Sequence, residues 1–347
     1  MAVFNHPEFD NHEQVVFCSD QETGLRAIIA VHSTRLGPAV GGCRLWNYAS
    51  DEEAIVDVLR LSRGMTYKNA MAGLPLGGGK SVIIGDAKTI KSEALFRAFG
   101  RMLQRLGGSY YSAEDVNITT ADIMQVNKET QFVAGLEGKS GNPGPFTALG
   151  TYQGIKAAAL HQFGSAELAG KTVAVQGLGS VGYALCDYLH KEGARLIVTD
   201  INQASIERAI SQFGATAVGL HGIYAVDADI YAPCALGATL NDETIAQLKA
   251  KVIAGCANNQ LKQARHGEML RQRGILYAPD YVINAGGIIN VACEMRSEGY
   301  NAVESTAKVN AIYNTLLNIF QRADAEDKPT SDVADVMAQE IIRRGKP

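Results

Sequence analysis

The feature that most restricts how this 347-residue chain can fold is the stretch KTVAVQGLGSVGYALCDYLHKEGARLIVTD, residues 171–200. An apolar run, TVAVQ, is followed by a glycine turn, a segment with helical periodicity, and a second apolar run, LIVT. This order predicts a strand, a turn, a helix and another strand, which is a βαβ unit. We therefore expect an α/β fold with a Rossmann domain in the second half of the chain.

The glycines of this stretch have the spacing of a dinucleotide-binding turn. Gly177 permits the tight turn, Gly179 lets the backbone approach a pyrophosphate, and Gly182 lets helix and strand pack closely. The phosphates would meet the positive N-terminus of the helix. Asp200, at the end of the second strand, can accept hydrogen bonds from a ribose 2′-hydroxyl but would repel a 2′-phosphate. The motif predicts NAD rather than NADP, and a glycine turn without ligand is the alternative.

Three later segments extend the expected cofactor site. DADIYAPCALG, KVIAGCANNQL and GILYAPDYVINAGG each begin with an apolar strand and end in small or amide residues. Ligands of such sheets bind at the carboxyl ends of the strands. For a single asparagine, turn formation is an equally open interpretation. The expected cofactor-binding residues are Gly177, Gly179, Ser180, Val181, Gly182, Asp200, Thr147, Ala235, Leu236, Asn258 and Asn284.

The length of the chain and its punctuation indicate two domains. A chain of 347 residues exceeds the usual size of one domain. Glycine and proline accumulate in GLEGKSGNPGPFTALG, residues 135–150, and interrupt regular structure, so we expect the boundary near residue 145. Helices are expected from near Ser92 to Gly107 and over about 147–163.

Composition excludes several classes of protein. The chain is 46% hydrophobic and 20% charged, with a formal net charge of −4, so it lacks the basic surplus of a nucleic-acid binder. The N-terminus does not have the pattern of a secretory signal, and no apolar run reaches membrane-spanning length. Six cysteines stand singly and the seven histidines form no metal-binding motif. We expect a cytoplasmic protein with reduced thiols, without a metal site, nucleic-acid partner or membrane segment.

Two lysines in the first half stand in an unusual setting, GMTYKNAMAGLPLGGGKSVIIGD. Ser50 and Glu53 form a capping box that begins a helix, and if this helix continues, Lys68 projects from its buried side. SVIIGD is typical of a buried strand, with Lys80 at its entrance after a glycine turn. A lysine near another cation and away from water has its neutral form favoured, as a base requires. These residues alone leave a catalytic pair and a structural ion pair equally open.

Several of these stretches together resemble the amino-acid dehydrogenase family that includes leucine, valine, phenylalanine and glutamate dehydrogenases. The resemblance is carried by GPAVGGCRLW, LRLSRGMTYKNA, GGGKSVIIGD, AEDVNIT, QGLGSVG and PDYVINAGGIINV. It implies two α/β domains separated by a cleft and a homo-oligomer. Residues 1–144 would bind substrate and form the oligomer, 145–326 would be the NAD-binding Rossmann domain, and 327–347 would be a helix that returns towards the first domain.

The resemblance also implies the reaction and the residues that perform it. The reaction would be oxidative deamination of an L-2-amino acid to the 2-oxo acid and ammonia, and its reverse. Lys68 would hold the substrate carboxylate, Lys80 would be the general acid/base for the attacking water, and Asp115 would handle the proton of the amino group. Asp115 has a plainer alternative as a helix-capping acid. Cys43, directly after the family's glycine pair, stands where we expect threonine or another residue.

The residue before the glycine pair bears on the choice of substrate. Glutamate dehydrogenases of the family carry a lysine there, whereas this chain has Val40, so we expect leucine, valine or isoleucine as substrate. Phenylalanine or tryptophan is the runner-up, and a non-catalytic nucleotide sensor is a further alternative that Lys68, Lys80 and Asp115 argue against. A hydroxyacid dehydrogenase would need a histidine acid/base, and no histidine has a suitable context. The expected substrate-binding residues are Lys68, Gly41, Gly42, Met65, Val40, Ala113, Ile288 and Val291.

Overall fold

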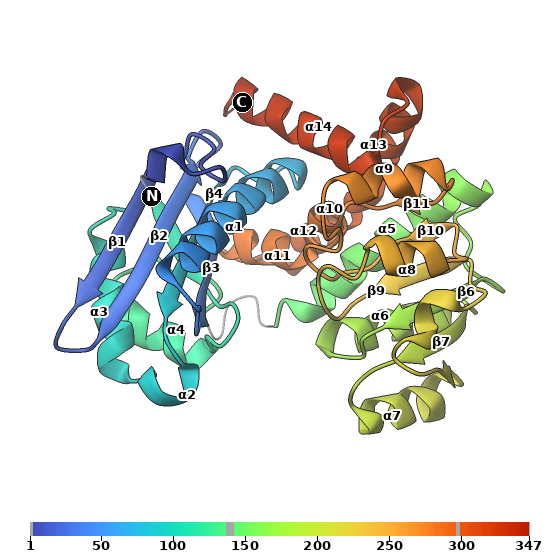
Figure 1. Ribbon diagram of the computed structural model, residues 1–347, viewed down its shortest axis with the longest axis horizontal. Helices are drawn as coiled ribbons and strands as arrows, with labels where there is room; N and C mark the ends of the chain where they lie inside the picture. Colours follow the sequence, from blue (N-terminus) through green and yellow to red (C-terminus); the bar gives the residue numbers. More distant parts are fainter. Residues whose placement is uncertain (1–2, 137–141, 296–298, 347) are drawn as a thin grey trace. The chain divides into compact units, whose positions relative to one another are not determined.

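A computed structural model describes residues 3–136, 142–295 and 299–346 of the chain (Figure 1). The chain folds as two compact units. Unit 1 comprises Met1–Gly141, Val291–Asn301 and Ala338–Pro347, and unit 2 comprises Asn142–Asn290 and Ala302–Met337. Residues 137–141, within the glycine- and proline-rich stretch expected at the boundary, lie outside the described residues.

Unit 1 is built on a mixed five-stranded sheet with the order β1-β2-β4-β3-β5. Neighbours β1 and β2, and likewise β2 and β4, run antiparallel, whereas β3 is parallel to both β4 and β5. Nearly every residue of β2 and β4 is buried, because helices cover the middle of the sheet on both faces. The strands are β1 (Gln14–Asp20), β2 (Leu25–Ser33), β3 (Ala39–Trp46), β4 (Gly77–Ile84) and β5 (Tyr110–Ala113).

The helices of unit 1 begin where the sequence predicts. The side chain of Ser50 accepts a hydrogen bond from the Glu53 backbone N–H at the start of α1, and Glu53 in turn accepts one from the Ala49 N–H. Ser92 caps α3 in the same way by accepting from the Leu95 N–H. The helices are α1 (Asp51–Met71), α2 (Ala87–Ile90), α3 (Glu93–Gln104) and α4 (Thr120–Asn127).

The glycine run before Lys80 is part of strand β4, so the expectation of a glycine turn is wrong. Close packing from neighbouring elements explains the glycines. A Cβ atom on Gly77 would lie 2.0 Å from the Ser33 carbonyl oxygen, and one on Gly78 would lie 2.0 Å from the Thr66 backbone nitrogen. Without side chains at these positions, helix α1 lies directly on the strand, and Lys80 follows inside the sheet.

Unit 2 contains a six-stranded parallel sheet with the order β11-β10-β9-β6-β7-β8. The chain runs outwards from β6 to β7 and β8 on one side, then returns to β9 and runs outwards to β11 on the other. This is the doubly wound order of a Rossmann fold, with its switch point between β6 and β9, and it confirms the predicted fold class. The strands are β6 (Thr172–Gln176), β7 (Arg195–Thr199), β8 (Thr216–Ala217), β9 (Ile230–Pro233), β10 (Val252–Ile253) and β11 (Leu276–Tyr277).

Helices pack on the sheet of unit 2 and complete the chain. In the first βαβ unit, α6 connects β6 and β7 as predicted. Two of the later helices, α11 and α14, begin in unit 2 and end in unit 1. The helices are α5 (Gly144–Phe163), α6 (Ser180–Lys191), α7 (Gln203–Phe213), α8 (Asp242–Gln247), α9 (Arg265–Gln272), α10 (Asp280–Ile283), α11 (Gly286–Glu294), α12 (Ala302–Asn310), α13 (Ile312–Glu326) and α14 (Thr330–Arg344). Within the described ranges, none of the helices is long and apolar enough to cross a membrane.

Candidate active site

Lys80 and Asp115 form a close ion pair in unit 1. Lys80 lies in β4 with only 8% of its side chain exposed, and its Nζ is 2.6 Å from Oδ2 of Asp115. Asp115 follows β5, which lies on the other side of β3 from β4. The pair therefore links two strands that flank β3, and it lies in surroundings where solvent screening is weak.

The glycine pair on β3 makes this arrangement sterically possible. A Cβ atom on Gly42 would lie 2.4 Å from the Glu114 carbonyl oxygen and 2.8 Å from Cβ of Asp115. One on Gly41 would lie 1.9 Å from the Gly79 carbonyl oxygen. Both glycines thus allow the neighbouring backbone to approach β3, and Gly42 determines how close the residues around Asp115 can come.

Arg44 is a member of this cluster that the sequence analysis missed. Its Nε lies 3.3 Å from Oδ2 of Asp115, and its Nη1 lies 3.0 Å from Oδ2 of Asp57 on α1. The Tyr48 hydroxyl donates to the same Asp57 oxygen at 2.6 Å. The available signal was the spacing of Gly42 and Arg44, because residues two apart in a strand project from the same face.

The surrounding charges keep Asp115 ionised. Burial by itself would raise the pKa of its carboxyl group, but the charges of Lys80 and Arg44 and the hydrogen bond from Lys80 outweigh burial. The pKa of Asp115 is therefore lowered from its ordinary value of 3.8. At neutral pH the cluster holds a carboxylate between two basic side chains.

Hydrogen bonds behind the cluster fix the backbone of the glycine pair. The hydroxyl of Tyr110, on β5, donates to the Gly41 carbonyl oxygen at 2.7 Å and lies 3.1 Å from Oγ of Ser81.

Cys43 is 1% exposed, and burial raises the pKa of its thiol to about 12. The thiol is therefore protonated near neutral pH, and Cys43 acts as a core residue here rather than as a nucleophile.

The remaining predicted substrate residues are distributed over both units. Met65 and Lys68 are half-buried on α1, which packs on β4, and Lys68 lies in the last turn of the helix. Val40 is fully buried directly before the glycine pair, and Ala113 pairs with Gly42 across the sheet. The structure thus brings six of the predicted residues together in unit 1, five on the adjacent strands β4, β3 and β5 and Asp115 just beyond the end of β5: Val40, Gly41, Gly42, Lys80, Ala113 and Asp115. On α11, Val291 belongs to unit 1 and Ile288 to unit 2.

In unit 2, the turn between β6 and α6 fits a bound pyrophosphate. Gly177 has a φ of +102°, and a Cβ atom on Gly182 would lie 2.0 Å from the Gly177 carbonyl oxygen, so both positions require glycine. A Cβ atom on Gly179 would meet no described atom within 4 Å, which leaves open space at the start of α6. Gly179 caps this helix without a side chain, so the first N–H groups, at Ser180 and Val181, can face a phosphate.

Asp200 directly follows β7 and reaches back to the glycine turn. Its Oδ2 accepts a hydrogen bond from the Leu178 N–H at 2.5 Å, and its Oδ1 accepts one from the Asn202 N–H at 2.7 Å. Each carboxylate oxygen can accept a second hydrogen bond. Asp200 is therefore held beside the turn and still has acceptor capacity for ribose hydroxyls.

Asn284 offers a buried acceptor near the carboxyl end of β10. It is 6% exposed, and its Nδ2 donates to Oδ1 of Asn258 at 2.6 Å and to the Cys256 carbonyl oxygen at 3.1 Å. Its Oδ1 is buried and has no hydrogen-bond partner among the described residues. A buried acceptor without a partner is costly, so this atom fits an amide N–H of a ligand such as nicotinamide.

The other predicted cofactor residues lie around these groups. Ala235 and Leu236 are exposed and begin two residues after the end of β9, at the switch point of the sheet. Thr147 lies in the first turn of α5, where its hydroxyl donates to the Pro143 carbonyl oxygen at 3.2 Å. A Cβ atom on Gly287 would lie 2.8 Å from that hydroxyl oxygen. The donor and acceptor set of unit 2 therefore fits a dinucleotide.

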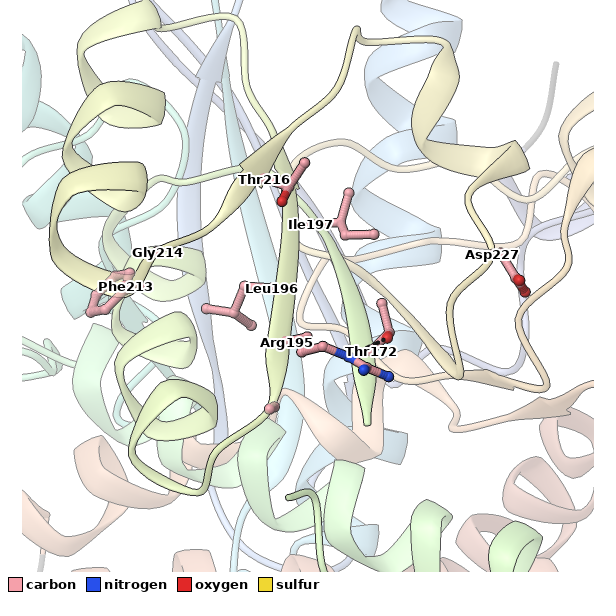
Figure 2. Close-up of a pocket in the computed structure, with 9 residues that line it drawn as sticks. Thr172, Arg195, Leu196, Ile197, Phe213, Gly214, Thr216 and Asp227 are labelled. Carbon is pink, nitrogen blue, oxygen red and sulfur yellow. Dashed lines mark hydrogen bonds between the residues drawn. The ribbon is translucent and has the colours of Figure 1, made fainter. Parts of the chain in front are cut away.

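Figure 2 shows a different pocket of unit 2. Thr172 and Arg195, which line it, are the first residues of β6 and β7, and Arg195 Nε lies 3.2 Å from Oγ1 of Thr172. This pocket is at the amino ends of the strands, opposite the glycine turn. Ligands of parallel sheets bind at the carboxyl ends, so we do not assign the dinucleotide to it.

Comparison with protein families identifies the family to which this chain belongs. Residues 12–135 match the model described as "Glu/Leu/Phe/Val dehydrogenase, dimerisation domain", and residues 198–341 match "Glutamate/Leucine/Phenylalanine/Valine dehydrogenase". The chain belongs to the Glu/Leu/Phe/Val dehydrogenase family. It is therefore an amino-acid dehydrogenase, an oxidoreductase of a dinucleotide-dependent family, as the sequence motifs indicate.

Individual relatives of this dehydrogenase cover almost the whole chain. Leucine dehydrogenase from Bacillus subtilis is 56% identical over 347 residues, which cover 99% of this chain and 95% of the relative. Phenylalanine dehydrogenase from Bacillus thermotolerans is 50% identical, with 98% and 91% covered. The crystal structure of L-tryptophan dehydrogenase from Nostoc punctiforme matches with a TM-score of 0.85 and 47% identity over 96% of each chain.

Among the described residues, no three His, Cys, Asp or Glu side chains are grouped so that they could hold a metal ion.

Proposed function

We propose that this dehydrogenase catalyses NAD-dependent oxidative deamination of an apolar L-amino acid, leucine, valine or isoleucine, and the reverse reductive amination. The observation that carries the proposal is the buried Lys80–Asp115 pair, 2.6 Å apart, beside the glycine pair of β3. The amino group and the attacking water both exchange protons next to the same carbon, so a base and an acid must lie close together there. The 56% identity to a leucine dehydrogenase supports the choice of substrate class.

The residues of unit 1 divide the proton transfers between them. Lys68 binds the substrate carboxylate. Asp115, ionised because its pKa is lowered, accepts a proton from the substrate amino group. Lys80, in its neutral form, takes a proton from the water as its oxygen bonds to the α-carbon of the imine. Asp115 then returns its proton to the amino nitrogen, the C–N bond breaks, and the hydroxyl proton leaves with the departing ammonia as ammonium to give the 2-oxo acid. When bound, NAD⁺ supplies the acceptor for the hydride that leaves the same carbon.

NAD is favoured over NADP because of Asp200. The groups proposed to hold NAD are the turn at Gly177–Gly182 for the pyrophosphate, Asp200 for the adenosine ribose, and Asn284 for the nicotinamide amide. Asp200 already accepts hydrogen bonds from two backbone N–H groups, so it is held in place as a carboxylate. A 2′-phosphate would be repelled by this negative charge.

An aromatic amino acid is the second candidate substrate. The phenylalanine dehydrogenase at 50% identity and the L-tryptophan dehydrogenase at 48% identity favour it.

We further propose a homo-oligomer, since the family model that matches residues 12–135 is described as a dimerisation domain. The six cysteines are all unpaired thiols, which supports the cytoplasm as the compartment.

The proposed function is tested by following NADH absorbance with L-leucine for the wild type and for Lys80→Ala. We expect Lys80→Ala to lose about 10²- to 10⁴-fold in turnover, the contribution of a general acid/base, while NADH binding by fluorescence stays close to wild type. Lys91→Ala is the matched control, because Lys91 is also paired to a carboxylate in unit 1, that of Asp122 at 2.5 Å. Near-normal turnover of Lys80→Ala would remove Lys80 from the mechanism.

A further inference from the structure

We propose that Arg44 is a positioning residue that orients the Asp115 carboxylate and sets the pH at which the Lys80–Asp115 pair releases its proton. The inference rests on the proposed function, in which this pair moves protons. It concerns a residue that lies next to the pair in unit 1 and that has no role in the proton transfers described above.

The contacts of Asp115 give the first argument. A single oxygen, Oδ2, accepts from Nζ of Lys80 at 2.6 Å and from Nε of Arg44 at 3.3 Å. A carboxylate oxygen has room for two such bonds, so the two cations do not exclude each other. Two donors from different strands fix both the position and the rotation of the carboxylate, which a single flexible lysine could not do.

The far end of Arg44 gives the second argument. Its Nη1 lies 3.0 and 3.3 Å from the two carboxylate oxygens of Asp57, and the Tyr48 hydroxyl donates to Asp57 at 2.6 Å. The guanidinium group is planar and rigid, so anchoring one end fixes the other. Arg44 thus transmits the position of α1, which carries Asp57, to the Asp115 carboxylate.

The charge of Arg44 gives the third argument. Lys80 and Asp115 are close enough to titrate as a pair, with apparent values that belong to both groups. A permanent positive charge 3.3 Å from Oδ2 disfavours protonation of that pair. Without the guanidinium the pair would keep its proton to higher pH, and it could accept substrate protons only at higher pH.

The other titratable groups around the pair do not replace this effect. Tyr110 of β5 and Cys43 of β3 lie nearby, and burial raises the pKa of both, so they are neutral in the working range. Asp57 and Tyr48 act on the pair through Arg44 itself. Lys68 of α1 is the other basic residue proposed for the site, and it is unchanged in all the variants below.

The test compares the pH profile of kcat/KM for leucine deamination in the wild type, Arg44→Gln and Arg44→Lys. We expect Arg44→Gln to move the acid-side limb upwards by about one pH unit and to lower kcat by about tenfold. Arg44→Lys keeps the positive charge, so the acid-side limb of its pH profile should stay near that of the wild type. Its kcat should still fall, because lysine lacks the planar donor geometry of the guanidinium group. Arg26→Gln is the matched control, since Arg26 on β2 also pairs with α1, through Asp51 at 2.6 Å, without contacting Asp115.

A limb that stays in place in Arg44→Gln, with or without a loss of kcat, would overturn the proposal and leave Arg44 a structural residue. A wild type that oxidises no amino acid would refute the proposed function instead. The role of Arg44 is then decided by carbon NMR of protein labelled at the aspartate carboxyl carbon. Titration of Asp115 at higher pH in Arg44→Gln supports the role, and an unchanged titration overturns it.

Discussion

Gly42 and Asp115 are so close that a side chain on Gly42 would displace Asp115: a Cβ atom on Gly42 would lie 2.8 Å from Cβ of Asp115. The Lys80–Asp115 pair therefore depends on a glycine in the strand between its two members. Asp115 lies beyond the end of β5, and the backbone next to it is held near β3 by a hydrogen bond that the Leu45 N–H donates to the Val116 carbonyl oxygen at 3.0 Å. The chemistry of the site is thus linked to a steric requirement in the sheet.

Gly42→Ala tests this link. The added methyl group would lie 2.4 Å from the Glu114 carbonyl oxygen, so we expect the segment around Asp115 to shift and the free energy of unfolding to fall by about 1–3 kcal/mol. Turnover should fall more than stability predicts, because Asp115 loses its position. Denaturant unfolding and NADH-linked assays on the same preparations measure both effects.

Gly64→Ala is the control for Gly42→Ala. Gly64 is inside α1, and a Cβ atom there would meet no described atom within 4 Å. Alanine at this position should stabilise the protein by up to about 1 kcal/mol and leave activity unchanged. If Gly42→Ala behaved like this control, Gly42 would not be needed for the position of Asp115.

The sequence predicted local features well and features of tertiary packing poorly. Ser50 and Ser92 cap their helices as expected, because capping depends on a few neighbouring residues. The strand, turn and helix at Gly177 were also correct for this reason. The glycines at 77–79 were misassigned, since their small size is required by close contacts with β2, α1 and β5, which are distant in sequence.

Arg44 was missed for a related reason. Its spacing from Gly42 places it on the same face of the strand, but this pattern alone does not distinguish a surface charge from a member of a site. Its two partners, Asp57 and Asp115, are 13 and 71 residues away, and only the folded chain brings them together. The family motif is therefore the source of the roles proposed for Lys80 and Asp115, whereas the sequence alone did not point to the residue that we propose positions them.

Asp200→Ser tests the choice of cofactor. The wild type should have a higher kcat/KM with NAD than with NADP, and loss of the carboxylate should narrow this gap by about one to two orders of magnitude. Serine has one side-chain oxygen in place of two, so it cannot replace both hydrogen bonds that Asp200 accepts from the Leu178 and Asn202 N–H groups, and a modest loss of stability should accompany the change. Equal efficiency with both cofactors in the unmutated enzyme would refute the role of Asp200.

Acid should destabilise unit 1 through His12. Its Nδ1 accepts from the Asp10 N–H at 3.2 Å, and its Nε2 lies 3.1 Å from the Leu59 carbonyl oxygen and 3.0 Å from Oγ of Ser62, so the neutral ring satisfies its surroundings. Burial, reinforced by the charge of His32, lowers the pKa of His12 from 6.5 to about 4. Between these values the unfolded chain binds a proton that the folded chain excludes, so stability is full above about pH 6.5 and falls as pH drops towards about 4.

The measurement for His12 is the melting temperature as a function of pH. His12→Gln removes the titrating group, and the melting temperature of this variant should fall less steeply over that range than that of the wild type. The comparison uses the slope, since the variant also changes packing. His221→Gln, at an exposed histidine, should keep the wild-type slope. Equal slopes for His12→Gln and wild type would show that His12 does not carry the acid sensitivity.

Val40 should exclude acidic substrates, which is the sharpest consequence of the proposed substrate class. Val40 is fully buried directly before the glycine pair, at the position where glutamate dehydrogenases of the family carry a lysine. A substrate carboxylate brought beside it would lose its hydration without gaining a partner, at a cost of several kcal/mol, which suppresses turnover by orders of magnitude.

The measurement compares kcat/KM for leucine, valine, phenylalanine, tryptophan and glutamate under one condition. We expect leucine or valine to lead and glutamate to be barely used, with differences of about 10- to 200-fold per methylene among the alkyl substrates. A phenylalanine or tryptophan optimum would preserve the role of Val40 and change the named substrate, whereas glutamate at or above the apolar set would overturn the assignment of the pocket.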